Sequence, residues 1–343
     1  MIPVQLMPNT RQTTDIAFLR RVFMVVAVGT LVAAVWALSD ILLLLFGAVL
    51  FAVILHSIAA PLHTYAGVGR PLALLISGAS IVLLLAAAGF YFGAELAAEM
   101  RNVFAILPEA LNRLAAQMQL GSAADMISNG AAASALGGLA SRIIAWSTTI
   151  AGAFGSLLLI LFGGLYLASN PSLYRDGILK LIPPALQPNV KATLDDAGIG
   201  LKRWLAGQAI AMLLVGTFTG LGLWLVGVPS AFALAVIVGL AEFLPIIGPV
   251  LAAIPALLIA STQDWQTVML ALAVLVAVQQ AESNLLTPLI ADQMLSIAPA
   301  VGLFAVVAMG VLFGPLGLVL GFPLTIVFDV AVRRLYVHDT LGE

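Results

Sequence analysis

One acidic side chain, Glu242, lies in an otherwise apolar stretch, three residues before Pro245. If this stretch lies in a membrane, an ionised carboxylate facing lipid is costly, and such groups normally face protein, water or a ligand. The position therefore favours a role for Glu242 in binding a solute or a coupling ion. The alternative is that the turn around Pro245 reaches the lipid headgroups and leaves the carboxylate solvated.

A second polar group lies near the end of a later apolar segment and consists of Gln279, Gln280, Glu282 and Asn284. In a helix, residues 280 and 284 share one face, and residues 279 and 282 share a neighbouring face. The spacing predicts a polar stripe that could line a binding site. The alternative is that the cytoplasmic end of a membrane span simply reaches the surface here, because Thr287-Pro288 follows closely.

Two Gly-Pro pairs, Gly248-Pro249 and Gly314-Pro315, interrupt apolar stretches. At the tip of a helical hairpin, backbone carbonyls and unpaired N–H groups can hold a cation or a polar ligand without a charged side chain. A kinked helix is the alternative. We favour hairpin tips because a further Pro245 or Gly317 stands three residues away, which is more than a kink requires.

The apolar stretches beside both Gly-Pro pairs are too short to cross about 30 Å of hydrocarbon at about 1.5 Å per residue. We therefore expect two re-entrant hairpins, at about residues 230–261 and 298–330, which dip into a membrane from opposite sides. Paired interrupted segments of this kind indicate the binding site of a transporter.

The composition supports a membrane protein, with 62% hydrophobic and 9% charged residues. Soluble domains have roughly 45–50% and about 25%. The chain has no Cys, three His and 14 scattered Lys and Arg, which argues against disulfides, Cys-based metal sites and nucleic-acid binding. No nucleotide-binding P-loop, HExxH or GxSxG motif is present, so we expect neither an enzyme nor a cofactor.

The expected fold is an all-α polytopic membrane protein with six spans and the two hairpins, which hydropathy counts as eight segments. The six spans cover residues 17–38, 41–60, 71–94, 146–169, 205–227 and 266–288. With both termini in the cytoplasm, Arg101, Arg113 and Arg142 are the only three of the 14 Lys and Arg outside, in agreement with the positive-inside rule. Eight full spans would give the same orientation.

Two regions between the spans are more polar. Residues 95–145 are expected to form an extracytoplasmic insert of amphipathic helices, with a Gly, Ala and Ser-rich loop at 121–138. Residues 170–203 are expected to form a cytoplasmic loop that ends in a helix leading to Trp204 at the membrane interface. Neither region is large enough for a second domain, so residues 1–343 form one transporter domain.

Several motifs in the last third of the chain occur in a recognisable order: Glu242-Phe243-Leu244-Pro245-Ile246-Ile247-Gly248-Pro249, Glu282-Ser283-Asn284-Leu285-Leu286-Thr287-Pro288, Gly314-Pro315-Leu316-Gly317 and Pro323-Leu324. In these motifs the chain resembles the autoinducer-2 exporter (AI-2E, PerM-like) family of bacterial transporters, over roughly residues 15 to 335. The resemblance implies a homopentamer in the bacterial inner membrane, two hairpins that contribute to substrate binding, and elevator-like movement. The chain departs from the family at Ala291-Asp292-Gln293-Met294, where a basic residue is usual, and at Ala298-Pro299, where His often precedes the Pro.

We therefore expect a secondary transporter that exports a small polar solute, such as an autoinducer-2-like signal used in quorum sensing. The predicted substrate-binding residues are Glu242, Pro245, Gly248, Pro249, Gln280, Glu282, Asn284, Gly314 and Pro315. Transport coupled to H⁺ or Na⁺ and uncoupled movement both remain open. The alternatives are a Na⁺/H⁺ antiporter of the same family and, from another class, a membrane scaffold that transports nothing.

Overall fold

A computed structural model describes residues 10–84, 86–87, 89–91, 150–245, 247–286 and 297–335. Throughout these ranges the chain consists of helices and turns, without strands, as predicted. The predicted insert at 95–145, with its loop at 121–138, and the segment 291–294 lie outside the described residues.

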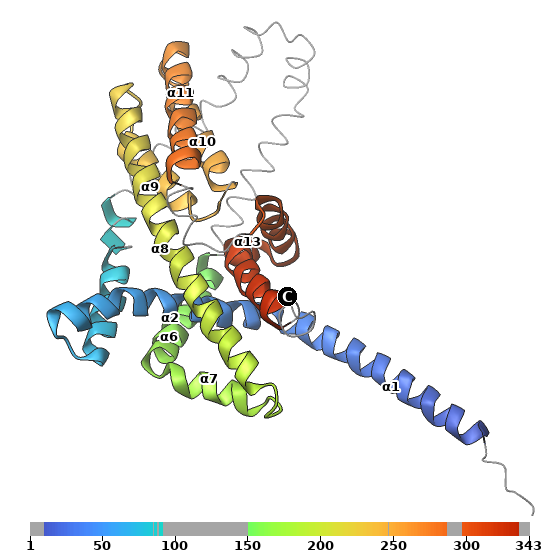
Figure 1. Cartoon of the computed structure of the whole chain (residues 1–343). Coiled ribbons are helices and arrows are strands. Elements are labelled where there is room, and N and C mark those ends of the chain that lie inside the picture. Colours follow the sequence, from blue (N-terminus) through green and yellow to red (C-terminus); the bar gives the residue numbers. More distant parts are fainter. Residues whose placement is uncertain are drawn as a thin grey trace, which may run out of the picture.

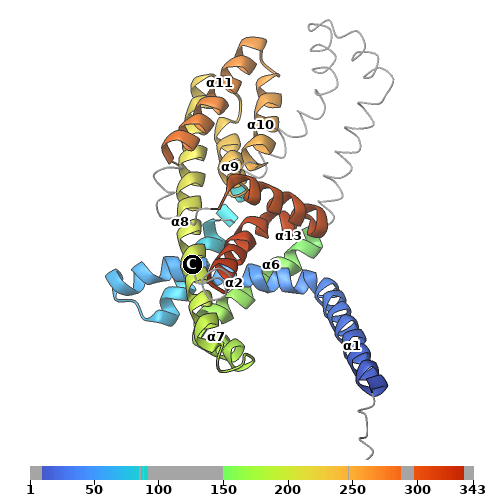
Figure 2. The ribbon, with the colours of Figure 1, turned by 45° about the vertical axis from the view of Figure 1, so that its right-hand side comes forward.

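The elements follow one another as α1 (Thr10–Ala37), α2 (Ser39–Ala66), a helix at Arg70–Tyr91, α6 (Ile150–Ser169), α7 (Pro171–Lys180), α8 (Gln187–Leu225), α9 (Ala231–Ala241), α10 (Ile247–Ala260), α11 (Trp265–Ala281), a π-helical turn (Glu282–Leu286) and α13 (Pro299–Val332). Helices α9, α10 and α11 pack along the C-terminal half of α8, whereas α2, α6 and α7 lie toward its other end (Figure 1). Helix α1 extends away from the rest of the chain in both views (Figures 1 and 2).

Helix α8 organises the fold because it joins both ends of the molecule. Its 39 residues unite the predicted cytoplasmic helix and the predicted span at 205–227 in one helix. Gly216 and Gly220 face α9, and a Cβ at Gly220 would lie 2.5 Å from the Ala235 Cβ. The Gly216-x-x-x-Gly220 spacing is therefore a helix-packing site, since small residues allow two backbones to approach closely.

Helices α9 and α10 form an antiparallel pair, which we call the first hairpin. They are 11 and 14 residues long, too short to cross a bilayer singly. Leu234 near the start of α9 shares a buried cluster with Ile259 near the end of α10. At the opposite end, Gly248 lies directly against the backbone carbonyl of Ala241. The tip of this hairpin therefore includes the turn at residues 242–245.

Helix α13 folds back on itself at Gly314, and we call its two arms the second hairpin (Figure 2). Gly314 has φ 65° and ψ −148°, a conformation that glycine adopts without steric cost. Gly310 lies against Leu318, and Gly321 lies against Val306. Contacts between residues at increasing distance from the bend show that the two arms run antiparallel, so the kinked continuous helix is ruled out at this position.

Within the described ranges, five helices are long and apolar enough to cross a membrane, and a sixth candidate is a bent pair. The five are Ser39–Ala66, Arg70–Tyr91, Gln187–Leu225, Trp265–Asn284 and Ala300–Leu335. The first four coincide with predicted spans, whereas the fifth passes by length although it bends at Gly314. Helix α6 turns through 87° into α7, and the predicted first span yields a short apolar helix, Val22–Ala37. A multi-pass membrane fold is thus supported, and the eight-segment count stays a prediction.

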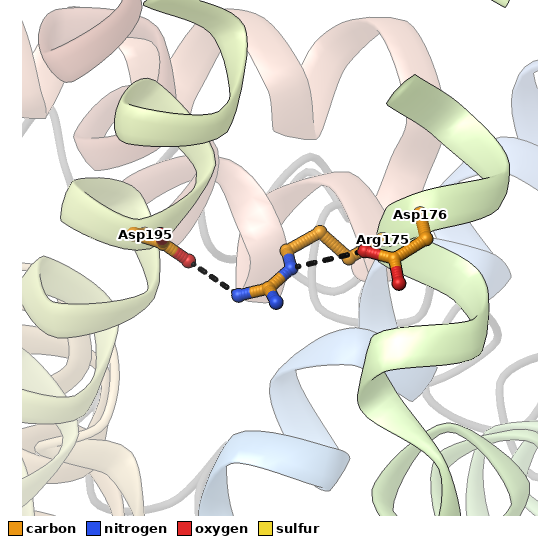
Figure 3. Close-up of polar contacts among 3 residues, drawn as sticks. All are labelled: Arg175, Asp176 and Asp195. Atoms are coloured by element: carbon orange, nitrogen blue, oxygen red, sulfur yellow. Dashed lines mark hydrogen bonds and ion pairs between the residues drawn. The ribbon is translucent and has the colours of Figure 1, made fainter. Parts of the chain in front are cut away.

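Ion pairs connect the polar ends of three helices. Arg175 of α7 reaches Asp195 of α8 with an Nη1–Oδ1 distance of 3.0 Å, and its Nε lies 3.7 Å from Asp176 Oδ1 (Figure 3). The next residue of α8, Asp196, pairs with Arg334 beyond the end of α13, with an Nη1–Oδ2 distance of 2.5 Å. Two adjacent aspartates of α8 therefore hold two different helices.

We expect Arg334→Ala to destabilise the protein by only about 0–1 kcal/mol, because exposed ion pairs contribute little. The Arg334 and Asp196 side chains are 43% and 41% exposed. Thermal unfolding of purified protein measures the change, which should shrink further at about 1 M salt, where the screening length falls to about 3 Å. Lys180→Ala, at an exposed site on α7, is the control. A large, salt-independent loss would contradict this expectation.

Candidate functional site

The carboxyl group of Glu242 lies inside the protein at the tip of the first hairpin. The residue is 3% exposed and follows directly after the last residue of α9. Its Oε2 atom has no hydrogen-bond partner among the described residues. A buried polar atom without a partner is costly and calls for an explanation such as a bound ligand or ion. In this conformation the carboxyl group is not at the surface of the chain.

Gln208 holds the tip from the neighbouring helix. Its Nε2 donates a hydrogen bond to the backbone carbonyl of Glu242, and its side chain is buried. Gln208 was not among the predicted site residues. An amide near the start of the apolar 205–227 span is a signal that could have identified it, because buried polar groups need partners. The bond fixes the backbone of Glu242 relative to α8.

Glu282 is the second acidic residue at this site. It begins the π-helical turn Glu282–Leu286, and such turns are frequent at functional sites. Gln279 donates a hydrogen bond to it, with an Nε2–Oε2 distance of 2.5 Å. Val278, four residues before Glu282 on α11, packs against the same buried cluster as Ala241, the residue before Glu242. The end of α11 that carries Glu282 therefore lies on the side of α9 where the first tip begins.

The other two members of the predicted polar stripe, Gln280 and Asn284, are exposed. Asn284 Nδ2 donates to the Gln280 backbone carbonyl at 2.9 Å and to its side-chain Oε1 at 3.2 Å. The predicted pairing of faces, 280 with 284 and 279 with 282, is thus confirmed by hydrogen bonds.

The backbone N–H groups at the first tip are already used. The Gly248 N–H donates to the Leu244 carbonyl at 2.8 Å, and the Ile247 N–H donates to the Pro245 carbonyl at 2.8 Å. The expectation of unpaired N–H groups is therefore wrong at Gly248, because the tip closes as a tight turn that pairs them internally. Pro249 lies in the first turn of α10, where its missing N–H costs nothing. Hydrogen-bond donors for a polar ligand at this tip would therefore have to come from side chains rather than from these backbone N–H groups.

Trp204 joins the two hairpins. Its ring packs edge-on against Phe243 of the first tip, with centroids 5.4 Å apart, and stacks on Phe322 of the second hairpin at 5.6 Å. The residue is 2% exposed, and its Nε1 has no described hydrogen-bond partner. The position of Trp204 at the membrane interface stays a prediction, and the structure adds that both hairpins bury the ring.

The bend of the second hairpin lies in a different environment. Phe313, next to Gly314, packs against Trp36 at the end of α1, with centroids 5.7 Å apart. A cavity of about 420 Å³ adjoins this contact and is lined by Leu31, Val32, Val35, Trp36, Ser39, Leu42, Leu43, Phe46, Met309, Phe313 and Leu324. The Ser39 hydroxyl and the Trp36 indole N–H are the only polar side-chain groups among these residues, so the cavity does not suit a polar solute. Pro315 itself is exposed.

Comparison with known proteins identifies the family of this chain. The sequence profile of the AI-2E family transporters matches residues 23–336. The chain belongs to this family. A protein of Escherichia coli K12 named "Putative transport protein YhhT" is 27% identical over 324 residues, which cover 91% of this chain and 88% of that protein.

Two further relatives match over shorter stretches. "Putative transport protein YrrI" of Bacillus subtilis is 31% identical over 165 residues, 48% of this chain and 47% of the relative. "Putative transport protein MT0215" of Mycobacterium tuberculosis is 31% identical over 202 residues, 57% of this chain and 54% of the relative. The matched stretches thus span about half the length of these two relatives. The family and the names of these relatives agree on a membrane transporter.

In this AI-2E family chain, the predicted site residues fall into three places. Glu242, Pro245, Gly248 and Pro249 form the first tip, Gln280, Glu282 and Asn284 lie at the end of α11 and in the π-helical turn, and Gly314 and Pro315 form the second bend. No group of three or more His, Cys, Asp or Glu that could hold a metal occurs in the part of the chain that the structure describes. His63 Nδ1 lies 2.8 Å from the Val68 carbonyl, which is a structural contact at the end of α2.

Proposed function

We propose that this AI-2E family protein is a secondary transporter that exports a small polar solute across the bacterial inner membrane. An autoinducer-2-like signalling molecule is the leading candidate, because the family takes its name from that solute. The observation that carries the proposal is the Glu242 carboxyl group, which is buried at a hairpin tip with Oε2 unpartnered. A carboxyl oxygen that is buried in an apolar fold and has no protein partner is suited to bind a polar ligand as the ligand crosses the membrane.

The proposed solute site lies beside the first tip, between Glu242 and Glu282. Pro245, Gly248 and Pro249 shape the tip, and Gln280 and Asn284 are the exposed polar groups at the end of α11. In the proposed mechanism the two hairpins dip into the membrane from opposite sides and move together in an elevator-like step. Trp204, which contacts both hairpins, supports their joint movement.

The remaining proposals concern assembly and topology. A homopentamer and a cytoplasmic position of both termini are proposed from the family resemblance and the distribution of Lys and Arg. A Na⁺/H⁺ antiporter is the second candidate function, and the pair of acids Glu242 and Glu282 is the observation that favours it. A scaffold that transports nothing would require these groups to be dispensable.

Transport in reconstituted vesicles tests the proposal. We expect the protein to move labelled autoinducer-2, and we expect Glu242→Gln to reduce the flux at least about tenfold, because removal of a charge from a ligand contact costs more than about 1.4 kcal/mol. Internal pH is followed in the same vesicles, with and without Na⁺. Asp264→Asn is the matched control, since Asp264 is an exposed acid at the start of α11.

Each outcome separates the candidate functions. Solute flux that depends on Glu242 supports the exporter. A Na⁺-dependent pH change without solute flux supports the antiporter. If neither is observed in vesicles that hold correctly folded protein, the chain is a scaffold and the proposed transport function is wrong.

A further inference from the structure

We propose that α7 lies along the membrane surface and inserts one apolar face into the lipid, so that it anchors the adjoining end of α8 to the bilayer. This face consists of Leu173, Tyr174, Ile178 and Leu181. Its partner is the bilayer itself, at the boundary between the headgroups and the acyl chains. The inference depends on the membrane-spanning fold of the chain and is independent of the solute and of any coupling ion.

The first observation is the direction of α7 relative to the helix before it. Helix α6 has 20 residues without a charge and agrees with the predicted span at 146–169. Only Asn170 separates it from α7, and the chain bends by 87° between the two helices. Membrane spans are tilted from the bilayer normal by about 20° on average. A helix perpendicular to such a span therefore runs close to the membrane plane, and it begins where the span ends.

The composition of α7 argues against a continuation of the span into the hydrocarbon. Its ten residues include three charged ones, Arg175, Asp176 and Lys180. Charged side chains inside the hydrocarbon are costly and rare. At the membrane surface the same side chains can reach water and the headgroups. The bend is therefore better explained by a helix that leaves the hydrocarbon than by a broken span.

The second observation is an apolar face on α7 that the described part of the chain leaves uncovered. The side chains of Leu173, Tyr174, Ile178 and Leu181 are 67%, 39%, 48% and 86% exposed. Positions 174, 178 and 181 follow one another at helical spacing, and position 173 lies beside them. The exposed charged residues Asp176 and Lys180 lie on a different side of the helix. A short helix with one apolar side and one charged side is typical of the membrane interface, where Tyr is also common.

The third observation is that the remaining side of α7 is attached to α8. Arg175 pairs with Asp195 of α8, with an Nη1–Oδ1 distance of 3.0 Å (Figure 3). At the start of α8, Gln187 Nε2 donates a hydrogen bond to the Ile182 carbonyl at 3.0 Å. Leu179, on the same side of α7 as Arg175, is half-buried. The side that holds α8 and the side offered to lipid are therefore different, and a helix bound to lipid would fix the depth of this end of α8.

The test measures membrane depth in purified full-length protein reconstituted in phosphatidylcholine vesicles. The chain has no Cys, so Leu173→Cys, Ile178→Cys and Leu181→Cys each provide one site for a nitroxide spin label. Asp176→Cys and Lys180→Cys are the matched controls on the same helix. Electron paramagnetic resonance compares collisions of each label with O₂, which concentrates in lipid, and with a water-soluble nickel complex. We expect the first three labels to lie about 5–10 Å below the membrane surface, with a higher ratio of O₂ to nickel collisions than the controls.

Each other outcome overturns the inference. If the labels on the apolar face collide with the nickel complex as often as the controls do, this face lies in water. If they are protected from both reagents, protein covers the face, and if the controls are equally deep in lipid, α7 continues the span. All five positions are exposed, so the Cys variants should fold, and the remaining variants decide if one does not. No transport is measured here, so a failure of the proposed export would leave this result unchanged.

Discussion

Trp204→Ala is expected to destabilise the protein by about 3–5 kcal/mol, the usual cost of truncating a buried aromatic side chain to Ala. The ring is 2% exposed and contacts Phe243 of the first hairpin and Phe322 of the second. Its loss leaves a cavity between α8 and both hairpins. Thermal unfolding of purified protein should show a midpoint lower by on the order of 10 °C.

Trp224→Ala is the matched control because Trp224 lies on the same helix, α8, but is 58% exposed. Its replacement should change stability by only about 0.5 kcal/mol, as is usual for surface positions. Trp204→Phe should fall between the two, since it keeps an aromatic ring between Phe243 and Phe322. Equal midpoints for Trp204→Ala and Trp224→Ala would show that the ring does not hold the hairpins together.

The helical membrane fold and both hairpins could be predicted from local sequence because each rests on a short-range rule. Segment length and the Gly-Pro pairs are sufficient to predict the antiparallel pair α9–α10 and the two arms of α13. Helical spacing is sufficient to predict which residues are joined by the hydrogen bonds of Gln279 and Asn284. How deeply these hairpins enter the membrane remains a prediction.

The environment of the site could not be predicted, since it depends on packing between distant segments. Trp204 was expected at the membrane interface, where Trp is common, but Phe243 and Phe322 bury it from positions 39 and 118 residues further along the chain. Gln208 was overlooked for the same reason, because its partner, Glu242, is 34 residues away. Neither contact changes the local pattern of apolar and polar residues, so sequence periodicity does not reveal it.

Gly248→Ala is expected to disrupt the first tip. A Cβ at this position would overlap the Ala241 backbone carbonyl and also approach the Glu242 backbone N to 3.3 Å. A backbone atom cannot rotate away as a flexible side chain can, so the turn that positions Glu242 has to open. The cost should be at least about 1–3 kcal/mol, the range for overpacked sites, and it should be accompanied by loss of transport.

Gly198→Ala is a control that should stabilise the protein, whereas Gly248→Ala should destabilise it. Gly198 lies in the interior of α8, and a Cβ there would meet nothing within 4 Å. Because Gly in a helix interior is less favourable than Ala by about 0.5–1 kcal/mol, this substitution should raise the unfolding midpoint. Contrasting shifts for two identical Gly→Ala changes would therefore locate the strain at the tip. If Gly248→Ala also stabilised the protein and left transport intact, the close approach between Ala241 and Gly248 would not exist in the folded protein, and the proposed position of Glu242 would lose its structural basis.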